Sequence, residues 1–369
     1  MNNSLNKKLS YCFIEPSSSL HSQSFLNSLL WSASKLQQLR VSVLCPNQII
    51  SSLLLTRPSF NIYTFNLLSL LKIAWCSFRE TSIIHFTKIE SYLCQTIILS
   101  YLAFPLSKIV CTIHWLPVTR TSALNITDIK PFVHFIFLKI LSWRIKFFIV
   151  HTEECFLHLK RLGIKSILAS YPLDIEQLKL KANLQRPNSN HKLLDIQKKQ
   201  VLFVGDIRLD KGIELVSKLT SYLPCYCELI VAGNNKSLPQ KFNAYLKSLA
   251  YNSNQFIYKP GFVRDEELIS LIGEADVILL PYNNLHRGAS GILGLAALAE
   301  TPVIASNNHN ISEVVKKYSL GLVADLSVKS FSSALNSILN NDYYHSPDTS
   351  GFYRDHSPDI YLKAIINSI

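Results

Sequence analysis

Two cations in a short loop of the second half could stabilise an anion. Arg208 and Lys211 lie in the segment 205–212, GDIRLDKG, which follows an apolar run and precedes a helical pattern. Two such cations can converge above a sheet and stabilise the charge that develops on a diphosphate leaving group as a bond breaks. An ordinary solvated loop with surface cations is the alternative interpretation, and this segment alone favours that alternative.

A second segment combines small residues with a predicted helix start. The run 288–291, Gly-Ala-Ser-Gly, follows a predicted strand and a loop. Free backbone N–H groups at a helix start bind phosphate, and small residues allow a close approach. Ser290 and Gly291 are therefore candidate ligand-binding residues, although Ser290 could simply cap the helix.

The elements that must position these residues alternate regularly in the second half. Strands predicted at 201–204, 229–232, 256–258, 277–281 and 303–306 alternate with helices near 212–221, 237–250, 265–273, 290–299 and 327–340. This order predicts a parallel, doubly wound sheet, with the ligand at the carboxyl ends of the strands. Three of the five residues at those ends are glycines, as close backbone approach to a ligand would require: Gly205, Gly233 and Gly261.

The first half alternates more loosely. Strands are expected at 11–15, 41–45, 82–86, 109–114 and 147–151, with helices at about 20–39 and 131–143. Between about 175 and 199 the sequence loses apolar periodicity and gains polar residues, which indicates a domain boundary. We therefore predict a first domain at 1–180, a linker at 181–199 and a second domain from 200.

Length and composition agree with two folded domains. At about 100–200 residues per domain, the chain of 369 residues allows two domains, and a hydrophobic fraction of 48% is too high for a disordered chain. The eight cysteines form no C-x-x-C pair and no zinc-like cluster with histidine. Buried free thiols in a reducing cytoplasm are the expected state.

The positive charge belongs to the first half. Residues 1–180 hold 18 Lys and Arg against eight Asp and Glu, a balance of +10, whereas the remainder has a balance of +2. Such a half could face an anionic membrane, a phosphorylated acceptor or nucleic acid. Nucleic acid is disfavoured because the cations are scattered and not clustered with aromatic residues. The apolar stretches are interrupted, so no transmembrane helix is predicted.

A series of motifs in the second half resembles the nucleotide-sugar glycosyltransferases of the GT-B type, group 1 and family 4-like. The motifs occur in the family's order over about 115 residues: Val204-Gly205, Lys211-Gly212, Val231-Ala232-Gly233, Gly261-Phe262-Val263, Ala275-Asp276-Val277 through Pro281, Pro302 through Ser306, and Glu313-Val314-Val315. The resemblance covers residues 200–340 well and the first half weakly.

The chain departs from the family pattern at several positions. Asp206 replaces the usual arginine, and Arg208 is expected to take over that charge. The family's paired glutamates, which contact the donor sugar and the ribose, would fall on Arg287 and Leu295. Glu300 replaces a glycine two residues before Pro302. Leucine cannot accept a hydrogen bond from a ribose, so the sugar and the nucleotide stay open.

The resemblance implies a fold, a reaction and a set of site residues. The fold is α/β of the GT-B class, with two Rossmann-like doubly wound domains facing across a cleft, at 1–180 and 200–354, and a C-terminal helix at 355–369 that packs back on the first domain. Donor-binding residues would be Arg208, Lys211, Gly205, Gly233, Gly261, Phe262, Arg287, Ser290 and Gly291.

The first domain would bind the acceptor, and His114 is the catalytic candidate there. By resemblance it would lie near the donor sugar and orient the reacting groups or polarise an oxygen. A strand-end histidine bonded to the backbone is the alternative, and His151 is expected to be structural. No Asp-x-Asp motif occurs, so we expect no metal and no cofactor beyond the donor substrate.

The predicted function is transfer of a sugar from a nucleotide-sugar to a saccharide or lipid-linked saccharide in cell-envelope or exopolysaccharide synthesis. The enzyme is expected in the cytoplasm, with peripheral contact to the membrane through the segment 131–148, although burial of that segment is at least as compatible with its sequence. Two alternatives stay open: a catalytically degenerate member that acts as a binding partner, and a sugar-nucleotide epimerase. The sequence leaves open retention versus inversion and the oligomeric state.

Overall fold

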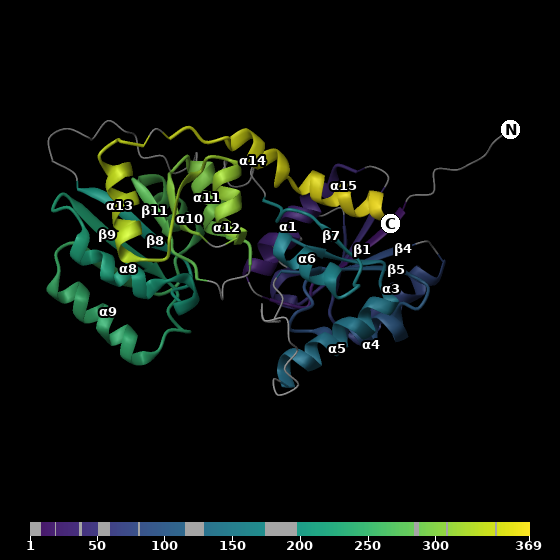
Figure 1. The fold of residues 1–369 in the computed structure, drawn as a ribbon. Helices are drawn as coiled ribbons and strands as arrows, with labels where there is room; N and C mark the ends of the chain where they lie inside the picture. The colour runs from purple at the N-terminus through teal and green to yellow at the C-terminus, as the bar shows by residue number, and fades with distance from the viewer. Residues whose placement is uncertain are drawn as a thin grey trace. The chain divides into compact units, whose positions relative to one another are not determined.

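The computed structural model divides the chain into two compact units. The first unit comprises Met1–Asp174 and Asp355–Ile369, and the second comprises Ile175–Arg354. The structure describes residues 9–18, 20–36, 39–50, 60–79, 82–114, 129–173, 198–283, 288–307, 309–343 and 345–369. Each unit contains one parallel sheet with helices on both faces (Figure 1).

The sheet of the first unit has its change of strand order between β1 and β4. Its order is β3-β2-β1-β4-β5-β6-β7, and all neighbouring strands are parallel. The strands are β1 (Leu9–Ile14), β2 (Leu39–Cys45), β3 (Asn61–Thr64), β4 (Ser82–Phe86), β5 (Lys108–Ile113), β6 (Phe147–Val150) and β7 (Ser166–Leu168). In such sheets the point where the order reverses is the usual ligand position.

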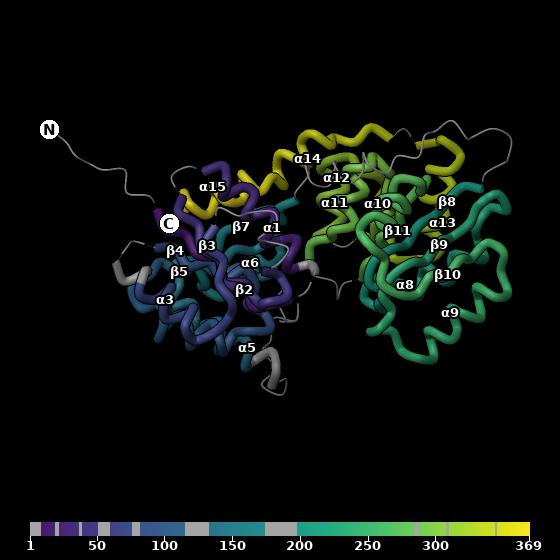
Figure 2. The backbone as a smooth tube through the Cα atoms, turned by 180° about the vertical axis from the view of Figure 1, so that it is seen from behind, coloured from purple at the N-terminus to yellow at the C-terminus, as the bar shows by residue number. Residues whose placement is uncertain are grey.

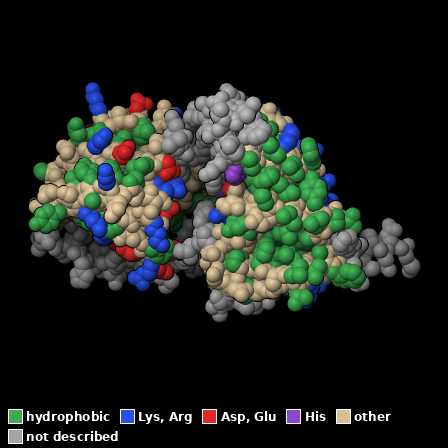
Figure 3. Space-filling view, turned by 90° about the horizontal axis from the view of Figure 1, so that it is seen from below, with side chains coloured by type: hydrophobic (Ala, Val, Ile, Leu, Met, Phe, Trp, Pro, Cys, Tyr) green, Lys and Arg blue, Asp and Glu red, His purple; other side chains and the backbone are tan. Residues whose placement is uncertain are grey.

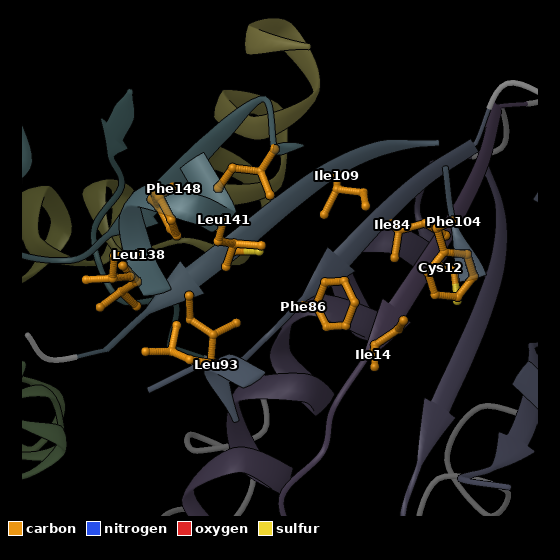
Figure 4. Packing of buried hydrophobic residues seen from close by; sticks show 14 of the residues in the cluster. Cys12, Ile14, Ile84, Phe86, Leu93, Phe104, Ile109, Leu138, Leu141 and Phe148 are labelled. Carbon is orange, nitrogen blue, oxygen red and sulfur yellow. The ribbon is translucent and has the colours of Figure 1, made fainter. Parts of the chain in front are cut away.

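The strands of this sheet are apolar on both faces because helices cover each side. Within β1, Cys12 and Ile14 pack on one side, whereas Tyr11 and Phe13 pack on the other. Figure 4 shows the first of these clusters, in which strand residues meet Leu93, Leu138 and Leu141 from the covering helices. These helices are α3 (Leu67–Arg79), α4 (Leu93–Ile98), the π-helix η1 (Leu99–Ala103), α5 (Ile129–Arg144) and α6 (Glu153–Arg161).

The other face is covered by helices from both ends of the chain. Helix α1 (Leu20–Ser34) packs against α15 (Pro358–Ser368), which lies on the first unit although it ends the chain (Figures 1 and 2). Tyr361, Leu362 and Ile365 of α15 are at most 2% exposed. The last helix therefore completes the core of the first unit.

The second unit has a six-stranded parallel sheet of order β10-β9-β8-β11-β12-β13. Its strands are β8 (Lys199–Val204), β9 (Cys227–Gly233), β10 (Phe256–Pro260), β11 (Val277–Leu280), β12 (Val303–Ser306) and β13 (Gly321–Ala324). Its α-helices are α8 (Ile213–Leu219), α9 (Gln240–Asn252), α10 (Asp265–Glu274), α11 (Gly291–Ala299), α12 (His309–Lys317), α13 (Val328–Leu339) and α14 (Thr349–Asp355). The order reverses between β8 and β11.

Both predicted doubly wound domains are confirmed, but several predicted bounds are wrong. The helix expected to reach residue 39 ends at Ser34, because Leu39 already pairs with Leu9 as the first residue of β2. Strands β3, β7 and β13 were not predicted from the sequence, since each is short and only partly buried. Of the predicted linker at 181–199, all but the last two residues lie outside the described part of the chain.

No helix in the described part of the chain is both long and apolar enough to cross a membrane. The cysteines for which the structure gives a state are free thiols, and five of the seven are buried. Burial raises the pKa of Cys12 to about 12, which keeps this thiol protonated and unreactive.

Candidate functional site

The switch point of the second unit brings Lys211 to the ends of β8 and β11. The Lys211 Nζ lies 3.5 Å from where a Cβ would stand on Gly205, the residue after β8. The same nitrogen lies 5.6 Å from the ring centroid of Tyr282, which follows β11 by two residues. The Lys211 ammonium thus lies beside the backbone at the place where doubly wound sheets bind their ligands.

The loop that carries Lys211 is fixed by backbone packing against the end of β11. Gly212 has a φ of +79°, and a Cβ there would stand 2.0 Å from the carbonyl oxygen of Pro281. Only glycine fits this contact without a shift of the backbone. The loop is also bonded to Asn283, whose N–H donates to the Asp210 carbonyl at 2.9 Å.

One strand-end glycine is required by its contact with another. A Cβ on Gly233, which has a φ of +141°, would stand 1.7 Å from the carbonyl oxygen of Gly205. The Gly261 N–H in turn donates to the Gly233 carbonyl at 2.9 Å. We expected these glycines to admit a ligand; for Gly233 the structure shows that close contact between neighbouring strand ends already demands glycine.

The start of α11 lies at the same edge of the sheet. Ser290 is its N-cap, and the hydroxyl accepts from the Leu293 N–H at 3.3 Å, as the capping alternative predicted. The Tyr282 hydroxyl and the Ser290 hydroxyl are 3.2 Å apart. A Cβ on Gly291 would meet no atom of the described residues within 4 Å, so these residues leave room for a ligand to approach the backbone at Gly291.

Arg208 is held differently from Lys211. Its Nη2 donates to Asp210 Oδ2 at 3.0 Å, in an ion pair whose side chains are 36% and 25% exposed. Its Nε is buried and has no hydrogen-bond partner among the described residues. The cation that was expected to converge with Lys211 therefore shares its charge with a carboxylate of its own loop.

The remaining donor-site candidates differ in how far the structure describes them. Gly261 has a φ of +133° with open space at the Cβ position, and the adjacent Phe262 is 66% exposed. Leu295 lies half-buried on α11, at the position where the resemblance expects a glutamate. Arg287 lies outside the described residues.

The switch point of the first unit is built from buried polar side chains instead of glycines. Glu15 follows β1 and is fully buried, and its Oε2 accepts from the Thr87 hydroxyl at 2.7 Å. Thr87 follows β4, so this bond spans the point where the strand order reverses. The Ser17 N–H donates to the other carboxylate oxygen at 2.8 Å. Burial raises the pKa of Glu15, while the Thr87 and Ser17 bonds act in the opposite direction.

A second buried carboxylate holds His114 at the end of β5. The Glu90 side chain accepts from the His114 N–H, and the His114 Nε2 lies 3.0 Å from the Thr87 carbonyl oxygen. Because a carbonyl can only accept, Nε2 carries the proton in this bond. The structure thus places His114 at the carboxyl edge of the sheet, as expected, and bonds it to the backbone, as the structural alternative expected.

An aromatic cluster surrounds His114. The ring of Phe25 approaches it edge-on with centroids 4.7 Å apart, and the ring of His151 lies 5.0 Å away. The Nδ1 of His151 donates to the Ala169 carbonyl at 3.0 Å. Tyr171 touches both histidine rings, with centroids 5.9 Å and 5.2 Å away.

Glu15 and Glu90 are site residues that the sequence analysis missed. Glu15 directly follows the fully apolar run 11–14, which is where an acidic residue is least expected unless it faces a site. That signal was available in the sequence. Glu90 has no comparable signal, because its bond to His114 depends on how two loops meet in space.

The described residues contain no group of three or more His, Cys, Asp or Glu side chains arranged to hold a metal ion. The groups that the two switch points offer for chemistry include Lys211, Arg208, the amides at the start of α11, Glu15, Glu90 and His114.

Comparisons with known proteins agree with this geometry. Residues 185–350 match the family model described as glycosyl transferases group 1. The whole chain resembles HepE from Anabaena, solved with UDP, with a TM-score of 0.73, 11% identity and coverage of 98% of this chain and 100% of that chain. No curated protein sequence matches the chain significantly.

Two further solved structures share the fold. A glycosyltransferase from Rickettsia africae has a TM-score of 0.71 and 13% identity, over 98% of this chain and 97% of that one. The sucrose-phosphate synthase of Thermosynechococcus elongatus has a TM-score of 0.66 and 15% identity, over 96% of each chain. Residues 185–350 therefore match the group 1 glycosyl transferase family, and the chain as a whole shares the GT-B fold of these solved structures.

Proposed function

We propose that the chain transfers a sugar from a nucleotide-sugar bound at the β8–β11 edge of the second unit to an acceptor bound at the β1–β4 edge of the first. The observation that carries this proposal is the position of Lys211, whose ammonium lies beside the Gly205 backbone at the switch point. A diphosphate placed there would meet one cation and the open first turn of α11.

Uridine diphosphate is the first nucleotide to test. HepE was solved with UDP and with UDP-glucose, and its fold covers nearly all of this chain. Leaving-group charge would be stabilised by Lys211, by the amides at Ser290 and Gly291, and by Arg208 once the phosphate competes for it with Asp210. The proposal needs no metal, because these groups supply the positive field directly.

The acceptor side would use the buried polar groups of the first unit. A carboxylate, or the unprotonated nitrogen of a neutral histidine, at the carboxyl ends of the strands can accept a hydrogen bond from an acceptor hydroxyl and receive its proton. We assign Glu15 and His114 to this task, and Glu90 to positioning His114 through its backbone N–H. The acceptor class we propose is a saccharide or lipid-linked saccharide of the cell envelope, modified on the cytoplasmic side.

A catalytically silent binding protein is the alternative function. Leu295 favours it, because a half-buried leucine on α11 cannot accept a hydrogen bond from the ribose hydroxyls. A sugar-nucleotide epimerase would differ from both functions by converting the nucleotide-sugar with no acceptor present.

A thermal-shift screen against UDP, GDP, ADP, TDP and CMP tests the donor site. A ligand at 100 times its dissociation constant adds about 2.7 kcal/mol of stability, which is a clear rise in melting temperature. The rise should be lost in Lys211→Met and kept in Lys218→Met, which removes an exposed lysine from the neighbouring helix α8. Equal shifts in both variants would remove Lys211 from the donor site.

Consumption of the nucleotide-sugar separates the three functions. Release of the nucleoside diphosphate that depends on a saccharide acceptor supports transfer. Binding without any turnover over a panel of acceptors supports the silent protein, and acceptor-free conversion supports the epimerase.

A further inference from the structure

The first unit carries an apolar face that its own core does not use. Large hydrophobic side chains on α3, η1, α5 and the turn after η1 are between 62% and 79% exposed: Leu67, Leu68, Trp75, Leu102, Leu106 and Trp143. Figure 3 shows hydrophobic side chains gathered over this side of the unit. Single exposed apolar residues are ordinary, but a contiguous patch marks an interaction surface. We call these six residues the apolar face.

The helices that carry the apolar face are tied together. Arg144 of α5 donates through Nε to the Ser100 carbonyl at 3.0 Å and through Nη2 to the Ser107 carbonyl at 3.2 Å. The Tyr101 hydroxyl donates to the Ile140 carbonyl at 3.1 Å, and α3 packs against η1. The face is therefore a fixed surface and not a set of independent loops.

The segments that form the apolar face contain cations and no acids. Residues 67–79, 93–108 and 129–146 include seven Lys and Arg and no Asp or Glu. Two of the seven donate to backbone carbonyls: Arg144 donates to those of Ser100 and Ser107, and Lys139 donates to that of Leu162. Lys72 and Lys146, in contrast, are exposed.

The membrane contact expected from residues 131–148 needs a correction. Four apolar residues of that segment are buried in the core and cannot contact a membrane: Leu138, Leu141, Phe147 and Phe148.

An apolar face commonly contacts either a second protein chain or a membrane, and the charge around this face distinguishes the two. A second copy of this chain would bring an equally basic, acid-free surface against the first, which is repulsive. An anionic bilayer would accept the apolar side chains in its interfacial layer and attract the lysines at the same time. Tryptophan is enriched at that layer, and two of the chain's four tryptophans, Trp75 and Trp143, belong to the face.

We propose that the apolar face docks the first unit on an anionic lipid bilayer, with α3, η1 and α5 lying in the interface. The docking does not depend on the donor site, which belongs to the second unit. It deepens the proposed function because an enzyme held at a bilayer meets acceptors that are themselves anchored in lipid.

Vesicle sedimentation tests the docking with the full-length chain. The protein should sediment with phosphatidylcholine vesicles that contain phosphatidylglycerol, and less with phosphatidylcholine alone or in high salt. The triple variant Leu68→Glu, Leu102→Glu and Trp143→Glu should lose sedimentation by on the order of tenfold or more. The control Tyr251→Glu changes a side chain that is 91% exposed on α9 of the second unit, and should sediment as the unchanged protein does.

Two further measurements keep the result interpretable. The melting temperature and the nucleotide-induced shift of the triple variant must match those of the unchanged protein; if they do not, Leu68→Glu alone is used, since this side chain is 79% exposed. Vesicles should also shift the tryptophan emission to shorter wavelength, and Trp75→Phe with Trp143→Phe should abolish that shift. Sedimentation that survives the triple variant, no binding to either vesicle, or a dimer that the triple variant dissolves would each overturn the proposal.

Discussion

The two units place different chemical groups at the point where the strand order of the sheet reverses. In the second unit the carboxyl ends of the strands are lined by backbone: Gly205, Gly212 and Gly233 have neighbours within 4 Å of their Cβ positions, and the Lys211 ammonium is one of the neighbours of Gly205. In the first unit the edge is made of side chains, with Glu15 bonded to Thr87 across the switch point and Glu90 bonded to His114. Strand ends built from backbone suit a ligand that is recognised by its phosphates, whereas strand ends built from side chains suit the removal of a proton from the hydroxyl of an acceptor.

This difference explains which parts of the site could be predicted from the sequence. Glycines that the backbone demands recur at fixed offsets from strands, so Gly205, Gly212 and Gly233 were visible as motifs. Glu15 and Glu90 form no motif. The apolar run 11–14 marks Glu15 as unusual but does not reveal its partner, and nothing in the sequence marks Glu90. Their partners Thr87 and His114 lie 72 and 24 residues away, respectively.

The fold shows the same division. Strands with four or more buried residues in a row, such as β4 and β8, were found from the sequence. The edge strands β3, β7 and β13 were not, because they are short and only partly buried. Leu36 and Leu39 extended a helical pattern by chance, and pairing of Leu39 with Leu9 prevailed over that local preference.

The largest expected effect comes from a substitution at the glycine contact between the ends of β8 and β9. Gly233→Ala places a Cβ 1.7 Å from the Gly205 carbonyl oxygen, so strand β9 must shift; we expect a loss of more than about 3 kcal/mol in the unfolding free energy of the second unit. Gly261→Ala is the matched control, because the Cβ meets open space and only the positive φ opposes it. Urea unfolding of both variants measures the difference. Equal stabilities would mean that the edge can relax.

The next largest effect is expected from a substitution that destabilises the first unit alone. Leu362→Ala on α15 truncates a fully buried side chain and should cost about 2–5 kcal/mol. Ile360→Ala, two residues earlier and 44% exposed, should cost far less. The nucleotide-induced thermal shift, which reports on the second unit, should persist in both variants. Its loss in Leu362→Ala would show that the two units do not respond separately.

The stability of the first unit is expected to depend on pH through the buried histidine His85. Burial, with a smaller contribution from His151, lowers the pKa of His85 to about 3 from 6.5. Tyr11 and Thr112 hold the neutral ring at 3.0 Å and 2.7 Å. The unfolded chain binds this proton first as the pH falls from 6.5 to 3, so stability is lost in that window, by about 2 kcal/mol at pH 5.

The variant His85→Gln removes this titration. Its unfolding free energy is expected to be lower at pH 7 but to fall less between pH 7 and pH 5 than that of the unchanged protein. Chemical denaturation at both pH values gives the two slopes. Parallel slopes would mean that other groups control the acid sensitivity of the first unit.

The smallest effect is expected when Glu300 of the second unit is replaced by glycine. Glu300 ends α11 in the left-handed region, with a φ of 55°, at the position where the resemblance expects glycine. Glu300→Gly should therefore stabilise the unit by about 1 kcal/mol. Glu274→Gly, at the end of α10 in helical conformation, should destabilise it by about 1 kcal/mol. Differential scanning calorimetry of the two variants and of the unchanged protein shows whether the two substitutions change the stability in opposite directions.

The most direct test of the account titrates the nucleotide found in the screen into two variants, one from each edge. Lys211→Met should weaken the affinity by at least about tenfold, because a charge-assisted contact to phosphate is lost. Glu15→Gln should leave the affinity unchanged and reduce acceptor-dependent turnover. If Glu15→Gln weakened nucleotide binding as much as Lys211→Met, or if Lys211→Met bound the nucleotide as tightly as the unchanged protein, the donor would not be bound by Lys211 in the second unit alone.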